Sequence, residues 1–186
     1  MKDHFLKTIF YLSVFSFIII ACEPKVRTWE VLSPDEHLSI VLTHTRLDQD
    51  NKTELSYQVF LETEEGSIEM IRPSLLGISR SDGNFTNQLR FHSEGEIKEF
   101  TDCYELLSSK QSMIDYSGNE LTVTFKNDSN KLLSIDLRAL NDGVAFRYRF
   151  PETNDSLFTV TGEKTSFKVP QQGKAWIHPY DTITQV

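Results

Sequence analysis

The sequence lacks the short motifs by which many hydrolases and metalloproteins are recognised. It contains no Gly-x-Ser-x-Gly nucleophile elbow and no Gly-x-x-x-x-Gly-Lys phosphate loop. Its five histidines never form a His-x-x-x-His or His-Glu-x-x-His pair, and it has two cysteines. Paired carboxylates for acid and base catalysis need a known separation, which a sequence does not supply. We therefore expect no zinc site and assign no catalytic residue in this chain.

The chain is also short of positive charge, with 19 basic and 27 acidic residues among 186. Without residues 1–21 it keeps 17 basic and 26 acidic residues, a net charge of −9. A surface of this sign repels phosphate backbones, so nucleic acid is excluded as an expected partner.

Long hydrophobic runs are missing apart from one near the start, Ile9–Ala21. At ~1.5 Å per residue its 13 residues reach roughly 20 Å as a helix, short of the ~30 Å hydrocarbon core of a membrane. Lys2 and Lys7 precede the run and the small Ala21 ends it, which is the pattern of a secretory signal peptide. We predict that residues 1–21 are such a signal.

The end of this signal, Ile19-Ile20-Ala21-Cys22, resembles the bacterial lipoprotein box, although leucine is more usual at its first position. The resemblance implies that Cys22 carries a lipid and that residues 22–28 form the anchor and a short linker. Each buried methylene of an acyl chain contributes about 0.8 kcal/mol to membrane binding. We therefore expect an exported chain anchored to the cell envelope, in the periplasm or at the outer membrane, with the leaflet left open.

Lipidation of Cys22 would leave Cys103 as the only free cysteine and would exclude an intramolecular disulfide. Free cysteine is commonly a small buried apolar side chain. We expect burial for Cys103.

Helical periodicity is scarce, whereas apolar and polar residues alternate in many short runs between turn signals. This pattern predicts an all-β, antiparallel β-sandwich. The expected strands are Leu38 to Thr45, Leu55 to Glu62, Leu121 to Lys126, Leu132 to Leu140, Gly143 to Phe150, and Leu157 to Val169 interrupted at Gly162. We expect compact structure to begin near Trp29.

One segment, residues 96–110, allows both a helix and a strand. Ile97, Phe100, Tyr104 and Leu107 are spaced as on one helix face. Thr, Cys and Tyr in the same segment favour strands, and we favour extended structure there.

The clearest hairpin joins residues 132–140 to residues 143–150 through Asn141-Asp142-Gly143, which is turn chemistry. Arg147 and Arg149 share the polar face of its second strand. They either bind a ligand or serve structure, and pairing across the hairpin with Asp136 is a ready use for one of them. An exposed pair of this kind contributes only ~0.2 to 1 kcal/mol, and we favour the structural role.

Near the C-terminus the chain places Trp176, His178, Tyr180 and Asp181 within six residues. Exposed aromatic rings suit the apolar faces of sugars, and imidazole or carboxylate groups bond to sugar hydroxyls. The alternative is a strand end at which Trp176 and Tyr180 fill the core and Pro179 stops the ladder.

Taken in order, several motifs resemble the N-terminal domain of glycoside hydrolase family 97. They are Leu32-Ser33-Pro34-Asp35, residues 72–78 (RPSLLGI) before Ser81-Asp82-Gly83, residues 119–125 (NELTVTF), residues 137–151 (LRALNDGVAFRYRFP), Lys174-Ala175-Trp176 and Pro179-Tyr180-Asp181. The resemblance covers residues 29–186. It implies a β-sandwich of the galactose-mutarotase-like (super-sandwich) type, here incomplete at its C-terminus and truncated before a catalytic (β/α)8 barrel.

The family comes mostly from Bacteroidetes, and its members hydrolyse α-glucosides or α-galactosides. The resemblance implies an oligosaccharide partner, a missing barrel domain and an inactive chain. It implies that Trp176, His178, Tyr180 and Asp181 contact carbohydrate or face the barrel. Family α-glucosidases bind Ca²⁺ with a glutamate from this domain, but no residue here is matched to that glutamate, and we expect no cofactor in this chain. The alternative function is a stand-alone lipoprotein that binds oligosaccharides without cleaving them.

Overall fold

The computed structural model describes residues 26–47, 52–106, 113–153 and 155–176, and this part of the chain forms strands and no helix. The predicted all-β, antiparallel fold class is confirmed. The strands are β1 (Val26–Leu32), β2 (Leu38–Arg46), β3 (Thr53–Thr63), β4 (Gly66–Leu76), β5 (Ile78–Arg80), β6 (Gly83–Phe85), β7 (Arg90–Glu94), β8 (Lys98–Glu105), β9 (Met113–Lys126), β10 (Leu132–Leu140), β11 (Gly143–Arg149) and β12 (Val160–Glu163).

The first sheet is a meander of four antiparallel strands in the order β1-β2-β3-β4. Its strands alternate between buried and exposed positions, which is the pattern of a sheet with one face in the core. Ile40 and Leu42 of β2 and Leu55 and Tyr57 of β3 supply the inward-facing side chains. The alternation of apolar and polar residues in the sequence thus indicates which face of this sheet lies in the core.

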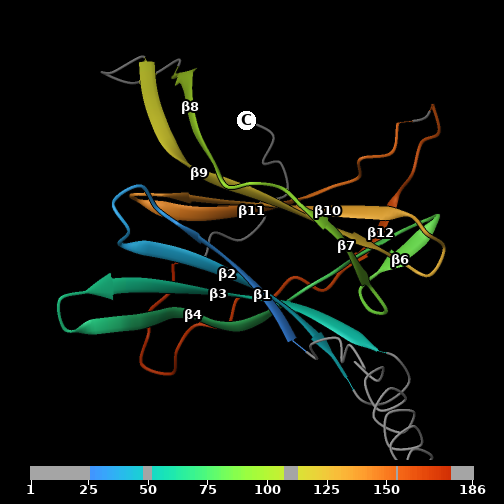
Figure 1. Cartoon of the computed structure of the whole chain (residues 1–186), viewed down its shortest axis with the longest axis horizontal. Helices are drawn as coiled ribbons and strands as arrows, with labels where there is room; N and C mark the ends of the chain where they lie inside the picture. Colours follow the sequence, from blue (N-terminus) through green and yellow to red (C-terminus); the bar gives the residue numbers. More distant parts are fainter. Residues whose placement is uncertain (1–25, 48–51, 107–112, 154, 177–186) are drawn as a thin grey trace, which may run out of the picture.

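The second sheet is built around the long strand β9, in the order β11-β10-β9-β7, and β8 also pairs with β9. β7 pairs with the last residues of β9, whereas β8 pairs with its first half, from Met113 to Glu120. The paired β8 and first half of β9 therefore form an arm that leaves the body of the molecule, as Figure 1 shows.

The two sheets pack face to face, with the β9, β10 and β11 layer above the β2, β3 and β4 layer in Figure 1. One cluster of buried side chains fills the space between them. Phe125, Leu133, Ile135 and Leu137 from the second sheet are fully buried in it. Burial of a side chain of this size contributes roughly 1.5 to 3 kcal/mol, so this shared core holds the sandwich together.

A small third sheet, in the order β12-β5-β6, closes one end of the sandwich. The predicted strand from Leu157 to Val169 is wrong in its extent, because only Val160–Glu163 forms a strand. Its partner β5 is three residues long, so β12 can form only a short ladder with it. Beyond β12 the chain is held by separate bonds, such as Ser166 N to Leu75 O at 3.0 Å.

Arg80 fastens this end of the fold. Its guanidinium donates to both carboxylate oxygens of Asp82, at 2.5 and 2.9 Å, and lies 4.0 Å from the ring centroid of Phe150 and 4.4 Å from that of Phe158. Lys131 Nζ also donates to Asp82, at 2.6 Å. The cluster joins the β5–β6 turn to the loop before β10 and to the segment after β11.

The predicted burial of Cys103 is wrong, because this cysteine is exposed on β8. The arm carries β8 away from the core, so a strand with apolar residues remains largely in solvent. The preference for extended structure over a helix in residues 96–110 is confirmed for Lys98–Glu105. Strand structure begins at Val26, slightly before the expected Trp29.

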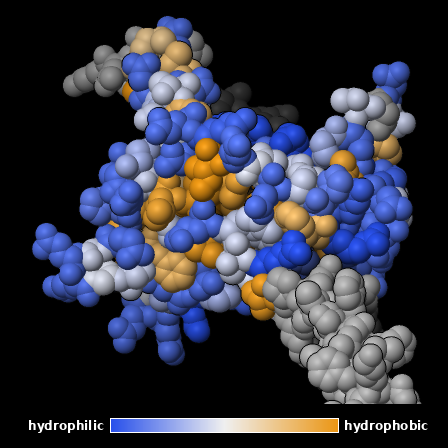
Figure 2. Space-filling view, in the orientation of Figure 1, coloured by the Kyte–Doolittle hydropathy of each residue, from blue (hydrophilic) through white to orange (hydrophobic). Residues whose placement is uncertain are grey.

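Figure 2 shows hydrophobic residues gathered toward the middle of one face, with hydrophilic residues around them. Within the described residues, no helix is long and apolar enough to cross a membrane.

Candidate functional site

The predicted C-terminal carbohydrate residues are only partly within the described residues. Trp176 lies at their end with 89% of its surface exposed, so the alternative in which its ring fills the core is wrong. His178, Tyr180, Asp181 and the predicted lipid anchor Cys22 lie outside the described residues and stay predictions.

The arginines of β11 have a structural partner, and the structure brings both of them to it. The Nε atoms of Arg147 and Arg149 each donate to Asp136 Oδ2 at 2.9 Å, and Arg149 Nη2 donates to Oδ1 at 2.8 Å. Thr122 Oγ1 donates to Oδ1 at 2.8 Å. The predicted use of one arginine is confirmed, but the expectation of an exposed pair is wrong, because the Asp136 side chain is 4% exposed.

This environment determines the charge of Asp136. Burial alone raises the pKa of its carboxyl, because a low-dielectric site disfavours the charged form. Hydrogen bonds from Arg149, Thr122 and Arg147 outweigh burial and lower the pKa to about 2. Asp136 is therefore a carboxylate at neutral pH, and its charge orients both arginines.

A second charged pair lies on the same face, next to aromatic rings. Arg138 Nε donates to Glu120 Oε2 at 2.5 Å, and its guanidinium lies 4.3 Å from the ring centroid of Phe100. Tyr116 packs edge-on against Phe100, and its hydroxyl donates to Asp102 Oδ2 at 3.0 Å. That hydrogen bond to a carboxylate raises the pKa of Tyr116 and keeps its hydroxyl protonated. The base of the arm thus carries ordered rings beside ordered charges.

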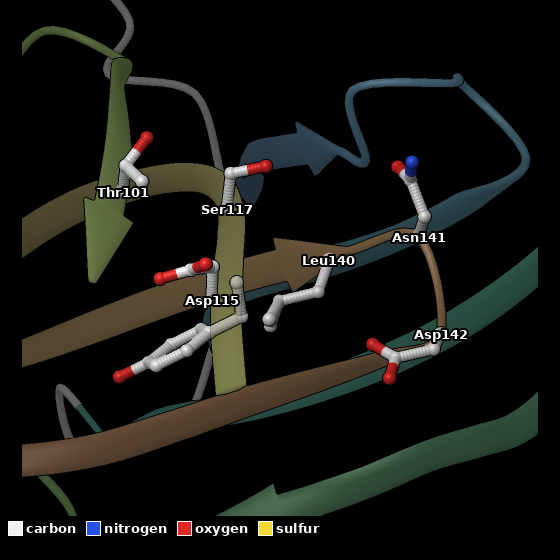
Figure 3. A pocket seen from close by; sticks show the side chains of 7 residues that line it. Thr101, Asp115, Ser117, Leu140, Asn141 and Asp142 are labelled. Atoms are coloured by element: carbon white, nitrogen blue, oxygen red, sulfur yellow. The ribbon is translucent and has the colours of Figure 1, made fainter. Parts of the chain in front are cut away.

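An open hollow of about 350 Å³ lies where the arm meets the β10–β11 turn. Three segments line it: Thr101 from β8, residues 115–117 from β9, and residues 140–142 from the end of β10 and its turn. Figure 3 shows Thr101 and Asp142 on opposite sides of this hollow, with Leu140 between them. The side chain of Asn141 also accepts a hydrogen bond from the backbone N–H of Asp35 at 3.1 Å, which ties the turn to the β1–β2 connection.

The lining of the hollow suits a polyhydroxylated ligand. Asp115 and Asp142 offer carboxylates, and Thr101 and Ser117 offer hydroxyls. Such groups accept and donate hydrogen bonds in the mixture that sugars require. This site could not be predicted from the sequence, because its parts are separated by up to 41 positions and the Asn141-Asp142-Gly143 run signals only a turn.

The described residues do not fit the calcium site that the family resemblance implies. Among them, no group of three or more His, Cys, Asp or Glu side chains is placed to hold a metal ion. Calcium prefers six to eight oxygen ligands, whereas the hollow gathers two carboxylates.

The chain matches a known protein family and several known proteins. The family model described as "Glycosyl-hydrolase 97 N-terminal" matches residues 31–185. A protein of Streptomyces bingchenggensis (strain BCW-1) named "Probable retaining alpha-galactosidase" is 26% identical over 164 residues, which are 88% of this chain and 24% of that protein.

Solved structures share the fold. A beta-arabinopyranosidase crystal structure superposes with a TM-score of 0.63 and 28% identity, over 77% of this chain and 22% of that one. A glycoside hydrolase family 97 enzyme from Pseudoalteromonas sp. strain K8, solved in complex with panose or acarbose, gives a TM-score of 0.59 and 22% identity, over 77% of this chain and 20% of that one. The chain thus spans about a quarter or less of these relatives' length. Because the family model covers most of its residues, this chain belongs to the glycosyl-hydrolase 97 N-terminal family.

Proposed function

We propose that this chain supplies the carbohydrate-associated β-sandwich domain of a glycoside hydrolase that cleaves α-glucosides or α-galactosides, and that the domain binds sugar without cleaving it. The observation that carries the proposal is the family match over residues 31–185. The relatives named above are glycoside hydrolases, and one of them is bound to panose.

The hollow at the base of the arm supports a binding role. It combines carboxylates and hydroxyls in a space of about 350 Å³, within the range of small-molecule sites. Trp176 adds an exposed ring elsewhere on the surface, at 89% exposure. Two surfaces of the chain thus offer contacts of the kind that oligosaccharides use, and separate variants distinguish them.

Isothermal titration calorimetry of the full chain with panose tests the proposal. We expect a heat of binding at millimolar panose. In a separate assay with p-nitrophenyl α-glucoside and p-nitrophenyl α-galactoside, we expect no release of p-nitrophenol. Asp142→Ala weakens binding if the hollow is the site, and Trp176→Ala weakens it if the C-terminal surface is. Glu64→Ala, on the β3–β4 turn and outside the lining of the hollow, is the matched control. Absence of heat contradicts binding, and turnover by the purified chain contradicts the non-catalytic role.

We also propose that Cys22 anchors the chain to the cell envelope through a lipid. The support is the sequence of residues 19–22, in which a small alanine precedes the cysteine. Expression of the full chain in a bacterial host with labelled palmitate should give a labelled membrane-associated product, and Cys22→Ser should remove both the label and the association. Equal labelling of both forms contradicts the proposal.

A further inference from the structure

We propose that the outer face of the second sheet binds the carboxylate of an acidic sugar, such as a hexuronic acid, beside Arg138 and Arg147. This inference rests on the proposed carbohydrate association but concerns another site and another class of ligand. Nothing in the relatives' names points to an acidic sugar.

The strand register places the charged groups on one face. Asp136 is the cross-strand partner of Arg147 on β11 and of Thr122 on β9, and Arg138 is that of Glu120. Cross-strand partners project to the same side of a sheet, as do residues two apart. Arg138, Arg147 and Arg149 therefore line a single face, opposite the face that fills the core.

Asp136 fixes the orientation of Arg147 and Arg149 before a ligand binds. Its two oxygens already accept four hydrogen bonds, from Arg147, Arg149 and Thr122. Arg147 donates to it through Nε, and the Arg147 side chain is 64% exposed. An arginine held in this way loses less conformational entropy when it binds, because its orientation is already fixed.

A small hollow lies between the two arginines. It has a volume of about 70 Å³ and is lined by Asp136, Arg138, Phe146 and Arg147. One water takes roughly 30 Å³ of liquid volume, so the hollow has room for about two heavy atoms. The two oxygens of a carboxylate are a group of this size. Arg138 is held at its edge by Glu120 and by the ring of Phe100.

The local charge favours an anion although the whole chain is acidic. Three guanidiniums and the ammonium of Lys98, the cross-strand partner of Glu120, face three carboxylates, Asp136, Glu120 and Asp102, which leaves one net positive charge at this face. Charges elsewhere on the chain, whose net charge is −8, are screened beyond about 8 Å at physiological salt. The planar fork of arginine matches the geometry of a carboxylate.

Aromatic rings beside the arginines favour a sugar over a bare anion. Phe100 and Tyr116 have ring centroids 6.0 Å apart, and Tyr104 lies 5.8 Å from Tyr116. They form a ledge at the base of the arm, next to Arg138, on which a pyranose ring could lie. Tyr116 also lines the larger hollow, but its neighbours Asp115 and Ser117 in that lining project to the opposite face of β9, so the two sites are separate.

Titration of the full chain with sodium glucuronate, glucose and sodium sulfate tests the inference. We expect glucuronate to bind at least tenfold more tightly than glucose, which has the same ring without the carboxylate. Arg147→Gln should weaken glucuronate binding at least fivefold, and Arg147→Lys should weaken it less, because it keeps the charge but loses the fork. Arg72→Gln, on the first sheet at 58% exposure, is the control and should change nothing. Raising the salt concentration should weaken binding of glucuronate.

Equal affinities for glucuronate and glucose overturn the inference. Equal affinities for glucuronate and sulfate, both lost in Arg147→Gln, overturn the sugar part and leave a general anion site. Circular dichroism and thermal melting of each variant confirm that it is folded. Panose binding that survives in Arg147→Gln keeps the two sites distinct, and absence of panose binding alongside glucuronate binding contradicts only the proposed function.

Discussion

At the scale of the residue, Asp136 organises the outer face of the second sheet. Its side chain is 4% exposed, although it lies on the face opposite the core. Arg147 and Arg149 cover it, and the methylene stems of such long side chains often shield the groups beneath them. A buried charge of this kind is tolerated because donors surround it.

Replacement of Asp136 by asparagine should lower the free energy of unfolding by about 2 kcal/mol at neutral pH. The amide keeps the shape but loses the charge that accepts bonds from Arg147 and Arg149, and a hydrogen bond to a charged group contributes about 1.5 to 3 kcal/mol. Urea denaturation measures the change. Asp142→Asn, at an exposed position, is the control and should stay within about 0.5 kcal/mol of the wild type.

The pairing of Arg147 with Asp136 could be predicted from the sequence, whereas that of Arg149 could not. Arg147 is directly opposite Asp136 once the hairpin is aligned through its turn. Arg149 is opposite Ser134 and reaches Asp136 diagonally, which depends on its rotamer. Diagonal neighbours in a sheet are about 7 to 8 Å apart, within reach of a long side chain but not fixed by the register.

At the scale of the element, strands with strong alternation were predictable and those with weak alternation were not. β10 runs from Leu132 to Leu140, as expected, because four inward-facing apolar residues alternate with polar ones. β4 was not predicted, since its Ile68 and Met70 are half exposed and Pro73 interrupts the pattern. The edges of the sandwich are therefore less evident in the sequence than its centre.

Gly118 is the residue at which β9 passes from the arm into the body. A Cβ at this position would lie 2.6 Å from the backbone oxygen of Ala139 and 3.0 Å from the ring of Phe100. We expect Gly118→Ala to lower the free energy of unfolding by about 1 to 3 kcal/mol, because a backbone atom cannot move aside as a side chain can.

Gly143→Ala is the matched control, since a Cβ there meets nothing within 4 Å. It should leave stability within about 0.5 kcal/mol of the wild type in the same urea titration. A Gly118→Ala variant as stable as the wild type would mean that β9 and β10 can separate locally without cost.

At the scale of the whole molecule, the fold class was predictable and the candidate site was not. The sandwich follows from the alternation of many strands, each of which needs a partner face. The hollow instead depends on how β8, β9 and the turn after Leu140 meet in space. A local sequence pattern does not predict this arrangement, because it results from the bend of β9 and from the registers of the β8–β9 and β9–β10 pairings.

Two carboxylates with lowered pKa values, Asp82 and Asp136, should make the molecule sensitive to acid. Hydrogen bonding from Arg80 lowers the pKa of Asp82 to about 2, against the opposing effect of burial and with further help from Lys131. The pKa of Asp136 is also about 2, and the ordinary value of both groups is 3.8. In the unfolded chain both groups bind protons at a higher pH than in the folded chain.

The unfolded state therefore takes up more protons as the pH falls from about 4 to about 2, and the free energy of unfolding decreases in that window. Above about pH 5 both groups are ionised in either state, so their contribution is constant. Urea titrations at a series of pH values measure the slope. The Asp82→Asn and Asp136→Asn double variant should be less stable at pH 7 but should show a shallower slope between pH 4 and 2. An unchanged slope would assign the acid sensitivity to other carboxylates among the 27 acidic residues.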